Sequence, residues 1–317
     1  MRILIAVDGS EPSELGRDLA TDVRWPSGSS LRVMAALDIG GALFGAPWYA
    51  VAPADIDDLE ERYLRELGGA VAFAAGSLAA PERTVTSTVL RGRAATSIVD
   101  EARRFGADLI VVGSRGHGTL ESMLLGSVSA EVVDHAPCPI LVARRPRLRS
   151  VLLADDGSAG ARAAAEKVAH WPIFEGLPVR VVSVAPTSVP WEPAYPSKYA
   201  PADGEAYRER GKAAIEAHQR VADDTARRLT LAGRPAVADV RAGDAAHEIV
   251  AAAHDADADL IVTGTRGHTG LARLVLGSVA RNVVHHAPCS VLIVPERTRS
   301  GSVRATESAL ETEATAR

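Results

Sequence analysis

Apolar and polar residues follow two patterns along the chain, short β-rich runs and longer stretches with helical spacing. In the first half, the predicted strands are residues 2–7, 31–37, 84–90, 108–112 and 140–142. Apolar residues at intervals of three and four predict helices over residues 11–23 (after a Ser10 cap), 56–78, 94–105 and about 123–135. Within the predicted strand 108–112, every residue after Asp108 is apolar, which is typical of a parallel strand buried on both faces.

The second half repeats the first at the scale of a whole domain. The segment ADLIVVGSRGH at residues 107–117 returns as ADLIVTGTRGH at residues 258–268. The repeat predicts further strands at residues 151–154, 179–184, 237–241, 260–263 and 291–294. Alternating strands and helices predict an α/β fold with two tandem doubly wound domains, each a five-stranded, mainly parallel sheet flanked by helices.

The domain limits follow from the repeat and from composition. We expect one domain over residues 1–145 and a second over residues 150–295, separated by a basic stretch that contains proline. Residues 296–317 hold few apolar side chains and much Ser, Thr, Glu and Arg, so we expect a disordered tail.

Composition narrows the function classes. The chain has 317 residues with 35 Lys+Arg and 40 Asp+Glu, a net charge of −5, so no basic excess favours a nucleic-acid partner. No apolar run reaches the ~18 residues of a membrane span. Two cysteines do not form a disulfide framework. We therefore expect a cytoplasmic protein that binds neither membranes nor nucleic acid.

Glycines gather after the fourth strand of each half, where open parallel sheets bind ligands. Gly113 and Gly116 precede Gly126 and Ser127 in the first half, and Gly264 and Gly267 precede Gly277 and Ser278 in the second, at identical spacing. Glycine lets phosphates approach backbone amides, and a helix start adds free N–H donors. The simpler interpretation is that these glycines only form turns, as most loop glycines do, but the repeated spacing favours ligand binding.

With these motifs, both halves of the chain resemble the universal stress protein family over about residues 1–295. The spacing Gly-x2-Gly-x9-Gly-Ser is the family's nucleotide signature, so the chain resembles a tandem member of its ATP-binding subclass. The resemblance implies an adenine-nucleotide alpha-hydrolase-like fold. It implies that the glycines and serines named above hold the phosphates and ribose of ATP, with or without Mg²⁺. The implied site also includes Val128 and Val279, which follow the two serines, Asp8 and Asp156 for adenosine, and Ala36 and Val184 for adenine.

Asp8 is also a candidate from its position alone. It ends the first strand, so its carboxylate lies at the ligand edge of the predicted sheet. The alternative is a turn aspartate that caps the next helix, but Ser10 is the better cap. Asp155, which precedes Asp156 and has Val7 as its counterpart, has no assigned role.

Other candidates have two interpretations each. Arg115 and Arg266 pair with phosphate or point into solvent. For His117 and His268, backbone N–H groups are better candidates than the rings. The spacing His-x-x-Cys in residues 135–138 and 286–289 suggests metal ligands, but no second pair is nearby and a buried thiol is favoured. Trp48 and Trp191, in proline-rich loops, cover a nucleotide, seal a subunit contact or pack at the surface.

The remaining motifs separate the function hypotheses. There is no Walker A pattern, no Gly-x-Gly-x-x-Gly after the first strands and no Gly-x-Ser-x-Gly in the glycine loops. The favoured hypothesis is a stress-response regulator that acts as an ATP-occupancy sensor for an unknown protein partner. The alternatives are a slow ATPase or phosphotransferase, an AMP- or cyclic-AMP-binding protein, and a scaffold in which nucleotide is structural. We expect the halves to pair through their last strands about a pseudo-two-fold axis, and a homodimer is a further expectation.

Overall fold

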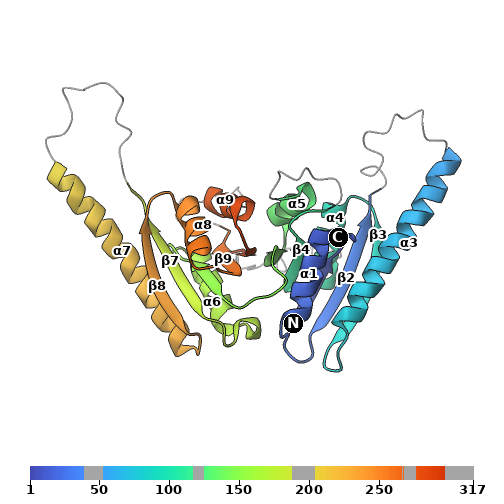
Figure 1. Ribbon diagram of the computed structural model, residues 1–317, viewed down its shortest axis with the longest axis horizontal. Helices are drawn as coiled ribbons and strands as arrows, with labels where there is room; N and C mark the ends of the chain where they lie inside the picture. Colours follow the sequence, from blue (N-terminus) through green and yellow to red (C-terminus); the bar gives the residue numbers. More distant parts are fainter. Residues whose placement is uncertain (39–52, 117–124, 188–203, 266, 268–275, 297–317) are drawn as a thin grey trace, which may run out of the picture.

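A computed structural model describes residues 1–38, 53–116, 125–187, 204–265, 267 and 276–296, with the backbone alone for residues 53–57 and 204–208. Figure 1 shows two α/β halves side by side, with one long helix outermost in each. No helix among the described residues is long and apolar enough to cross a membrane. Of the tail expected at residues 296–317, residues 297–317 lie outside the described residues.

The elements of the first half alternate along the chain as the pattern predicts. They are β1 (Arg2–Ala6), α1 (Glu11–Asp22), β2 (Ser30–Leu37), α3 (Pro53–Leu78), β3 (Thr84–Arg91), α4 (Ala94–Phe105), β4 (Leu109–Gly113), α5 (Ser127–His135) and β5 (Ile140–Ala143). The helix predicted from about residue 123 begins only at Ser127, because Gly126 adopts extended backbone and serves as its N-cap. Ser10 caps α1 as predicted, and its hydroxyl accepts a hydrogen bond from the N–H of Ser13.

The second half repeats this order, so the predicted fold class is confirmed. Its elements are β6 (Val151–Ala154), α6 (Ala159–His170), the 3-10 turn η1 (Pro172–Phe174), β7 (Val179–Ala185), α7 (Gly204–Leu231), β8 (Ala236–Ala242), α8 (Ala245–Asp255), β9 (Leu260–Gly264), α9 (Ser278–His286) and β10 (Ser290–Val294). The turn η1 was not predicted, since a single 3-10 turn has no periodic signal.

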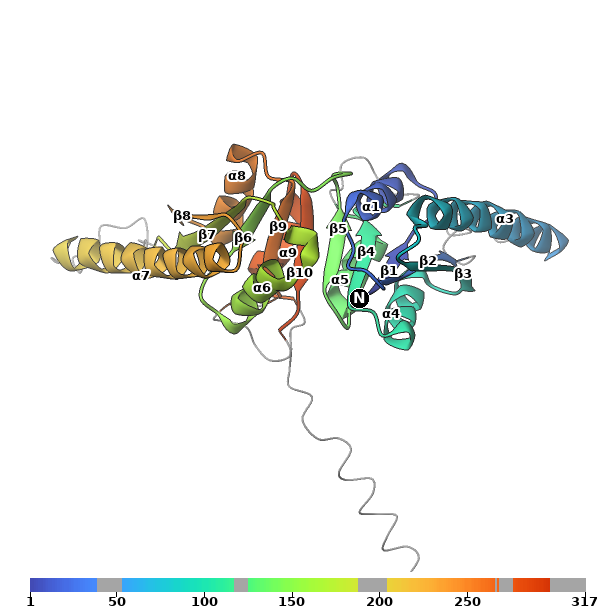
Figure 2. The ribbon, with the colours of Figure 1, turned by 90° about the horizontal axis from the view of Figure 1, so that it is seen from below.

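All strands join one ten-stranded sheet in the order β3-β2-β1-β4-β5-β10-β9-β6-β7-β8. Pairs within each half are parallel, while β5 and β10 pair antiparallel, with Leu141 opposite Leu292. The predicted pairing of the two last strands is therefore confirmed. Each last strand covers what would otherwise be an exposed edge of the other half. In Figure 2, α1 and α3 lie across the junction from α6 and α7, as a pseudo-two-fold axis between the halves requires.

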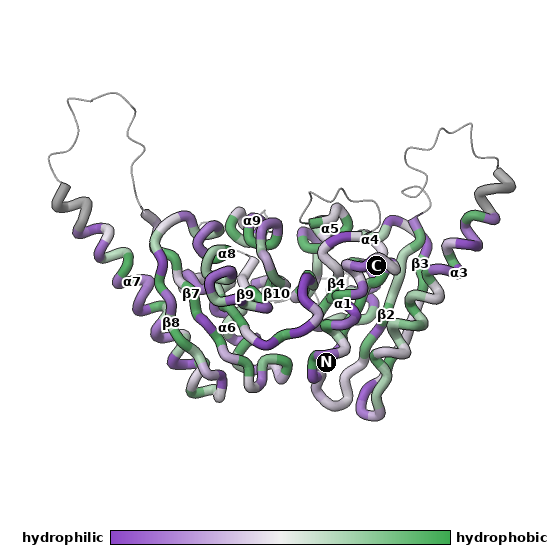
Figure 3. Tube along the Cα trace, in the orientation of Figure 1, coloured by the Kyte–Doolittle hydropathy of each residue, from purple (hydrophilic) through white to green (hydrophobic). Residues whose placement is uncertain are grey.

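Buried apolar side chains form two clusters, one on each face of the sheet. One contains Leu19 of α1, Val71 of α3, Val168 of α6 and Leu229 of α7. The other contains Ile98 of α4, Val132 of α5, Ile249 of α8 and Val283 of α9. Figure 3 shows the outer helices α3 and α7 with alternating hydrophilic and hydrophobic segments, as helices with one buried face must have. Within each half, the sheet is thus covered by helices on both sides.

Side chains also tie the halves together at the junction. Arg144, which follows β5, donates to the carbonyl of Val284 at 2.6 Å, and its backbone N–H donates to the Ser290 hydroxyl at 3.1 Å. Burial and the nearby charge of Arg115 lower the pKa of Arg144 to about 10. Arg281 of α9 pairs with Asp134 of α5 at 2.7 Å. The junction therefore holds a partly buried cation, bonded to backbone carbonyls, together with exposed ion pairs such as that of Arg281 with Asp134.

Candidate functional site

Each half begins its candidate site with the same Asp-Gly-Ser turn after its first strand. The Asp8 carboxylate accepts hydrogen bonds from the backbone N–H of Ser10 at 2.9 Å and from its hydroxyl. Asp156 accepts the matching bond from the N–H of Ser158 at 2.9 Å. The glycine between them has a positive φ of 81° in the first half and 78° in the second, which a side chain would strain. Both carboxylates are therefore held in one orientation at the carboxyl edge of the sheet.

The fold brings each of these carboxylates against a glycine more than 100 residues away in the sequence. A Cβ built on Gly116 would collide with Oδ2 of Asp8, and one built on Gly267 would lie 2.6 Å from Oδ2 of Asp156. Any side chain here would displace the carboxylate. The second glycine of each motif therefore lies in direct contact with the turn aspartate, in both halves.

The third glycine closes each loop at its base. The N–H of Gly126 donates to the carbonyl of Ser114 at 2.7 Å, and that of Gly277 donates to the carbonyl of Thr265 at 2.7 Å. A Cβ on Gly126 would lie 3.2 Å from Cα of Arg115. Both amides are therefore engaged within the protein in this structure. The assignment of Gly126 and Gly277 to the phosphates stays a prediction.

The backbone N–H groups at the starts of α5 and α9 remain available as hydrogen-bond donors. Helix geometry leaves the first N–H groups of α5, those of Ser127, Val128 and Ser129, without partners inside the helix. The same holds at the start of α9, at Ser278 and Val279. Val128 is 39% exposed and Val279 is 37% exposed. Each half thus presents a serine, an exposed valine and a positive helix end beside its glycine loop.

The first glycine of each motif has a packing role. Gly113 is buried at the end of β4, and a Cβ there would lie 2.5 Å from the carbonyl oxygen of Pro12 in α1. In the second half, a Cβ on Gly264 would lie 2.5 Å from the carbonyl carbon of Gly160 in α6. These two glycines allow a helix backbone to pack directly on a strand. Their assignment as phosphate contacts stays an untested prediction.

The remaining predicted site residues divide into two groups. Ala36 and Val184 occupy equivalent places near the ends of β2 and β7, where Ala36 pairs with Leu90 and Val184 with Arg241. Arg115 is half-buried beside Arg144. His117, Arg266, His268, Trp48 and Trp191 lie outside the described residues.

The two His-x-x-Cys segments contain buried thiols, as predicted. Cys138 and Cys289 are both buried and free. Burial, with a small contribution from Asp108, raises the pKa of Cys138 to about 12, and burial likewise raises that of Cys289 to about 12. Among the described residues, no group of three or more His, Cys, Asp and Glu side chains is placed to hold a metal. Both thiols therefore pack as small apolar groups.

Interactions made by serines were not predicted from the sequence. The Ser13 hydroxyl accepts the N–H of Asp8 at 3.3 Å and so steadies the turn from within α1. The Ser129 hydroxyl donates to the carbonyl of Gly113 at 2.7 Å, whereas Ala280 stands at the matching position of the second half. The only sequence signal for these bonds is the presence of serine near a helix start, which is a common position for it.

The fold and its duplicated edge define a tandem protein of two α/β domains joined through their last strands. Models of the universal stress protein family match residues 1–144 and residues 147–295. The chain therefore belongs to the universal stress protein family and carries two of its domains in tandem.

Individual relatives agree with this assignment. A universal stress protein of Thermus aquaticus is 34% identical over 145 residues, which cover 45% of this chain and 97% of that protein. Universal stress protein Rv2623 of Mycobacterium tuberculosis is 28% identical over 232 residues, 69% of this chain and 71% of that protein. The crystal structure of a universal stress protein from Archaeoglobus fulgidus has a TM-score of 0.61 at 18% identity and covers 93% of this chain and 98% of its own, which supports the fold.

Proposed function

We propose that each half of the chain binds one adenine nucleotide, ATP in preference to AMP or cyclic AMP, and that occupancy is read by a protein partner. The observation that carries the proposal is the contact between the turn aspartate and the second glycine of the motif, which is present in both halves. The carboxyl ends of parallel strands are a typical place for ligand sites, and this geometry is present at that edge in both halves. Membership of the universal stress protein family supports the same proposal.

The adenosine end of the ligand belongs at the Asp-Gly-Ser turn. Ser10 binds one carboxylate oxygen of Asp8, so the other carboxylate oxygen keeps a defined direction at the sheet edge. A carboxylate held in this way is a good acceptor for ribose hydroxyl groups. Ala36 lies on the neighbouring strand, where its backbone can contact the base. Asp156 and Val184 take these roles in the second half.

The phosphate end belongs at the starts of α5 and α9. With the Gly126 and Gly277 amides engaged, the proposed donors are the next N–H groups and the hydroxyls of Ser127 and Ser278. A helix N-terminus carries about half a positive charge, which favours a phosphate group. Mg²⁺, when bound, would enter with the phosphates, whose oxygens are its preferred ligands. This division accommodates a nucleotide with several phosphates.

We propose that the partner responds to whether nucleotide is bound and not to its hydrolysis. The N–H groups, hydroxyls and carboxylates named above stabilise the bound nucleotide rather than a transition state. Backbone donors that bind substrate and transition state equally do not accelerate a reaction. Rapid phosphoryl transfer needs a residue that orients water and a cation that meets developing charge. The two aspartates at the edge already hold serine N–H groups. Hydrolysis is therefore expected to be slow and incidental.

Mass spectrometry of the denatured protein, after saturation with nucleotide, tests the proposal directly. We expect two ATP molecules per chain for the wild type, one each for Gly116→Val and Gly267→Val, and none for the double variant. Gly68→Val in α3 is the matched control, because a Cβ there meets nothing within 4 Å. Unchanged stoichiometry in a folded double variant would place the ligand elsewhere.

A second measurement separates the sensor from an enzyme. Single-turnover hydrolysis with Mg²⁺ should be far slower than one per second, which is the lower end of ordinary enzyme rates. Binding of a protein partner should differ between ATP-loaded and nucleotide-free protein. Turnover near one per second, with partner binding independent of nucleotide, would favour the enzyme hypothesis.

A further inference from the structure

The second half buries a carboxylate oxygen that has no hydrogen-bond partner. Asp155 follows β6 directly and is 3% exposed. One oxygen, Oδ1, accepts the backbone N–H of Gly157 at 2.8 Å. Within the described residues, no group donates to the other oxygen, Oδ2. Burying an unsatisfied carboxylate oxygen is costly, and such groups in folded proteins usually have a specific reason.

The fold does not require an acid at this position. The N–H of Asp155 donates to the carbonyl of Val182 at 2.9 Å, and the N–H of Val7 donates to that of Met34 at 2.9 Å, so the two residues occupy the same place in their halves. Val7 is 7% exposed and packs in the core. The same backbone therefore accepts an apolar side chain, and the acid of the second half has another use.

A second polar residue accompanies Asp155. Aligning α3 and α7 by their buried residues places Ala74, which is 2% exposed, opposite Thr225, which is 1% exposed. Ala74 belongs to the apolar core of the first half. Thr225 instead accepts a hydrogen bond from Arg228 at 2.6 Å. Two positions of the pocket are thus polar in the second half and apolar in the first.

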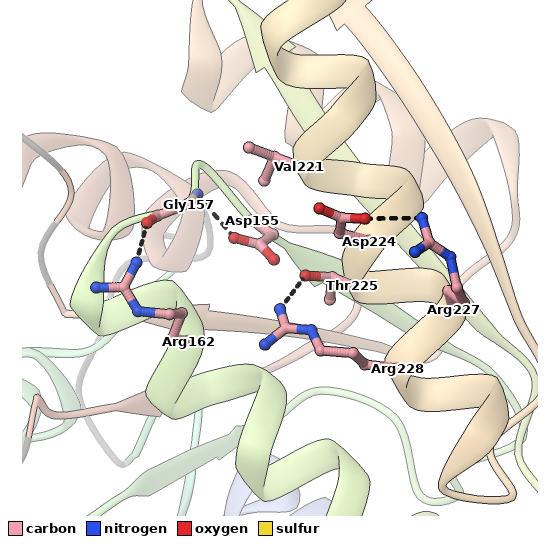
Figure 4. A pocket seen from close by; sticks show the side chains of 8 residues that line it. All are labelled: Asp155, Gly157, Arg162, Val221, Asp224, Thr225, Arg227 and Arg228. Atoms are coloured by element: carbon pink, nitrogen blue, oxygen red, sulfur yellow. Dashed lines mark hydrogen bonds and ion pairs between the residues drawn. The ribbon is translucent and has the colours of Figure 1, made fainter.

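Asp155 and Thr225 line a pocket of about 470 Å³ between α6 and α7. Figure 4 shows Asp155 directed into the space between the two helices, with Arg162 on one side and Arg228 on the other. Arg227, also at the pocket, pairs with Asp224 at 2.7 Å. The pocket therefore holds a buried acid at its centre and a rim of basic side chains.

The two arginines that flank Asp155 indicate that the pocket's ligand also carries a negative charge. Arg162 donates to the carbonyl oxygen of Gly157, and Arg228 donates to the hydroxyl of Thr225. Both of these acceptors are uncharged, so each guanidinium can still bind an anionic group. A simple cation would satisfy Asp155 but not the arginines, and a simple anion would do the reverse. A ligand that carries an ammonium and a carboxylate satisfies both.

We propose that this pocket binds a small zwitterion, a free α-amino acid, with its ammonium on Oδ2 of Asp155 and its carboxylate on Arg162 and Arg228. Its acid differs from that of the proposed nucleotide site, because Asp155 lines the pocket whereas Asp156 lies against Gly267; Gly157 of the turn borders the pocket as well. It exists once per chain, since the first half has Val7 and Ala74 instead. It does not depend on nucleotide binding.

Calorimetric titration of the full chain with each of the twenty free amino acids tests the proposal. We expect at least one to bind with a stoichiometry of one per chain. Asp155→Asn, which keeps the shape of the side chain and removes its charge, should weaken binding at least about tenfold, the effect of one charged hydrogen bond. Asp155→Val should abolish binding and still fold, because the first half folds with valine at that place.

Blocked ligands and a nucleotide measurement complete the design. The N-acetyl and methyl-ester forms of the bound amino acid should each bind at least about tenfold more weakly, because each lacks one charged group. ATP stoichiometry, measured on the same samples, should be unchanged in Asp155→Val, so failure of the nucleotide proposal is seen separately. Asp156→Asn is the reciprocal control and should retain amino-acid binding.

Three results would overturn the proposal. One is that none of the twenty amino acids binds. Another is binding that persists unchanged in Asp155→Val, which would place the ligand at a different site. The third is equal binding of inorganic phosphate and of the amino acid, which would make the pocket an anion site formed by its arginines alone.

Discussion

The turns after β1 and β6 share one backbone but differ in chemistry on the face covered by the long helices. On the face of the glycine motif, Asp8 and Asp156 accept the same bond from a serine N–H and contact equivalent glycines, Gly116 and Gly267. On the opposite face, Val7 packs in the core while Asp155 lines a pocket. Duplication has therefore kept the geometry of one face in both halves, and the other face has diverged at single residues.

The difference between Val7 and Asp155 shows how much of a buried site depends on its neighbours. Thr225, Arg162 and Arg228 surround the acid of the second half. The matching positions around Val7 include Ala74, which offers no polar group. In this chain, the buried acid stands where a pocket and polar neighbours accompany it.

The largest effect is expected from Val7→Asp, which places the second half's acid in the first half. The carboxylate would be buried without polar neighbours, so we expect a loss of about 2–4 kcal/mol in the free energy of unfolding. Urea unfolding measures it. Val128→Asp is the control, because Val128 is 39% exposed and should change stability by less than about 0.5 kcal/mol. A loss no larger than in this control would show that the first half also tolerates an acid.

The next effect tests whether the first glycine of each motif has the same packing role in both halves. Gly113→Ala and Gly264→Ala add a Cβ 2.5 Å from a backbone atom of α1 or α6, so each should lose about 1–3 kcal/mol. Gly69→Ala in α3 is the matched control, since its Cβ meets nothing within 4 Å and alanine favours the helix by about 0.5–1 kcal/mol. Equal stability of all three variants would contradict the packing role.

A gain of stability is expected from Asp155→Val in the absence of ligand. Removing a buried carboxylate with an unsatisfied oxygen should add about 1–2 kcal/mol, because the new side chain repeats the packing of Val7. Thermal unfolding of the wild type and the variant provides the measurement. Loss of stability would mean that the bond from Gly157 to Asp155 contributes more than the unsatisfied oxygen costs.

The smallest effect concerns pH at the junction, where His285 of α9 stands at the place of Asp134 in α5. Burial lowers the pKa of His285 below its usual value of 6.5, and the charges of His286, Arg281 and Arg144 lower it further, although Asp134 opposes them. The unfolded chain then binds the proton more readily. The neutral His285 ring therefore makes its full contribution to the free energy of unfolding above about pH 6.5. That contribution declines as the pH falls from 6.5 towards the lowered pKa.

His285→Gln should remove that decline below pH 6.5. The change should stay below about 0.5 kcal/mol, because the ring is only partly buried and solvent screens its charge. His247→Gln, at an exposed position of α8, serves as the control. Urea unfolding between pH 5 and pH 8 compares the three proteins, and identical pH profiles would exclude His285 as the source.

The sequence by itself determined the strands and helices, the duplication and the place of the glycine motifs after the fourth strand of each half. These features depend on local patterns, such as the apolar run of β4, the Ser10 cap and the regular glycine spacing. Asp8 could be placed at the sheet edge because it directly follows a strand. Even the pairing of β5 with β10 was predicted, since an apolar edge strand needs a cover.

Only the tertiary structure decided what several of these residues contact. Gly113 packs on Pro12, Gly116 contacts Asp8, and Asp155 faces a pocket formed with α7. Each contact joins residues that are far apart in the chain, so no local pattern records it. The Gly126 N–H is engaged for the same kind of reason, because the loop returns to Ser114. A glycine or an acid in the sequence shows that a special position exists, but the atoms that meet it are set by the packing of distant elements.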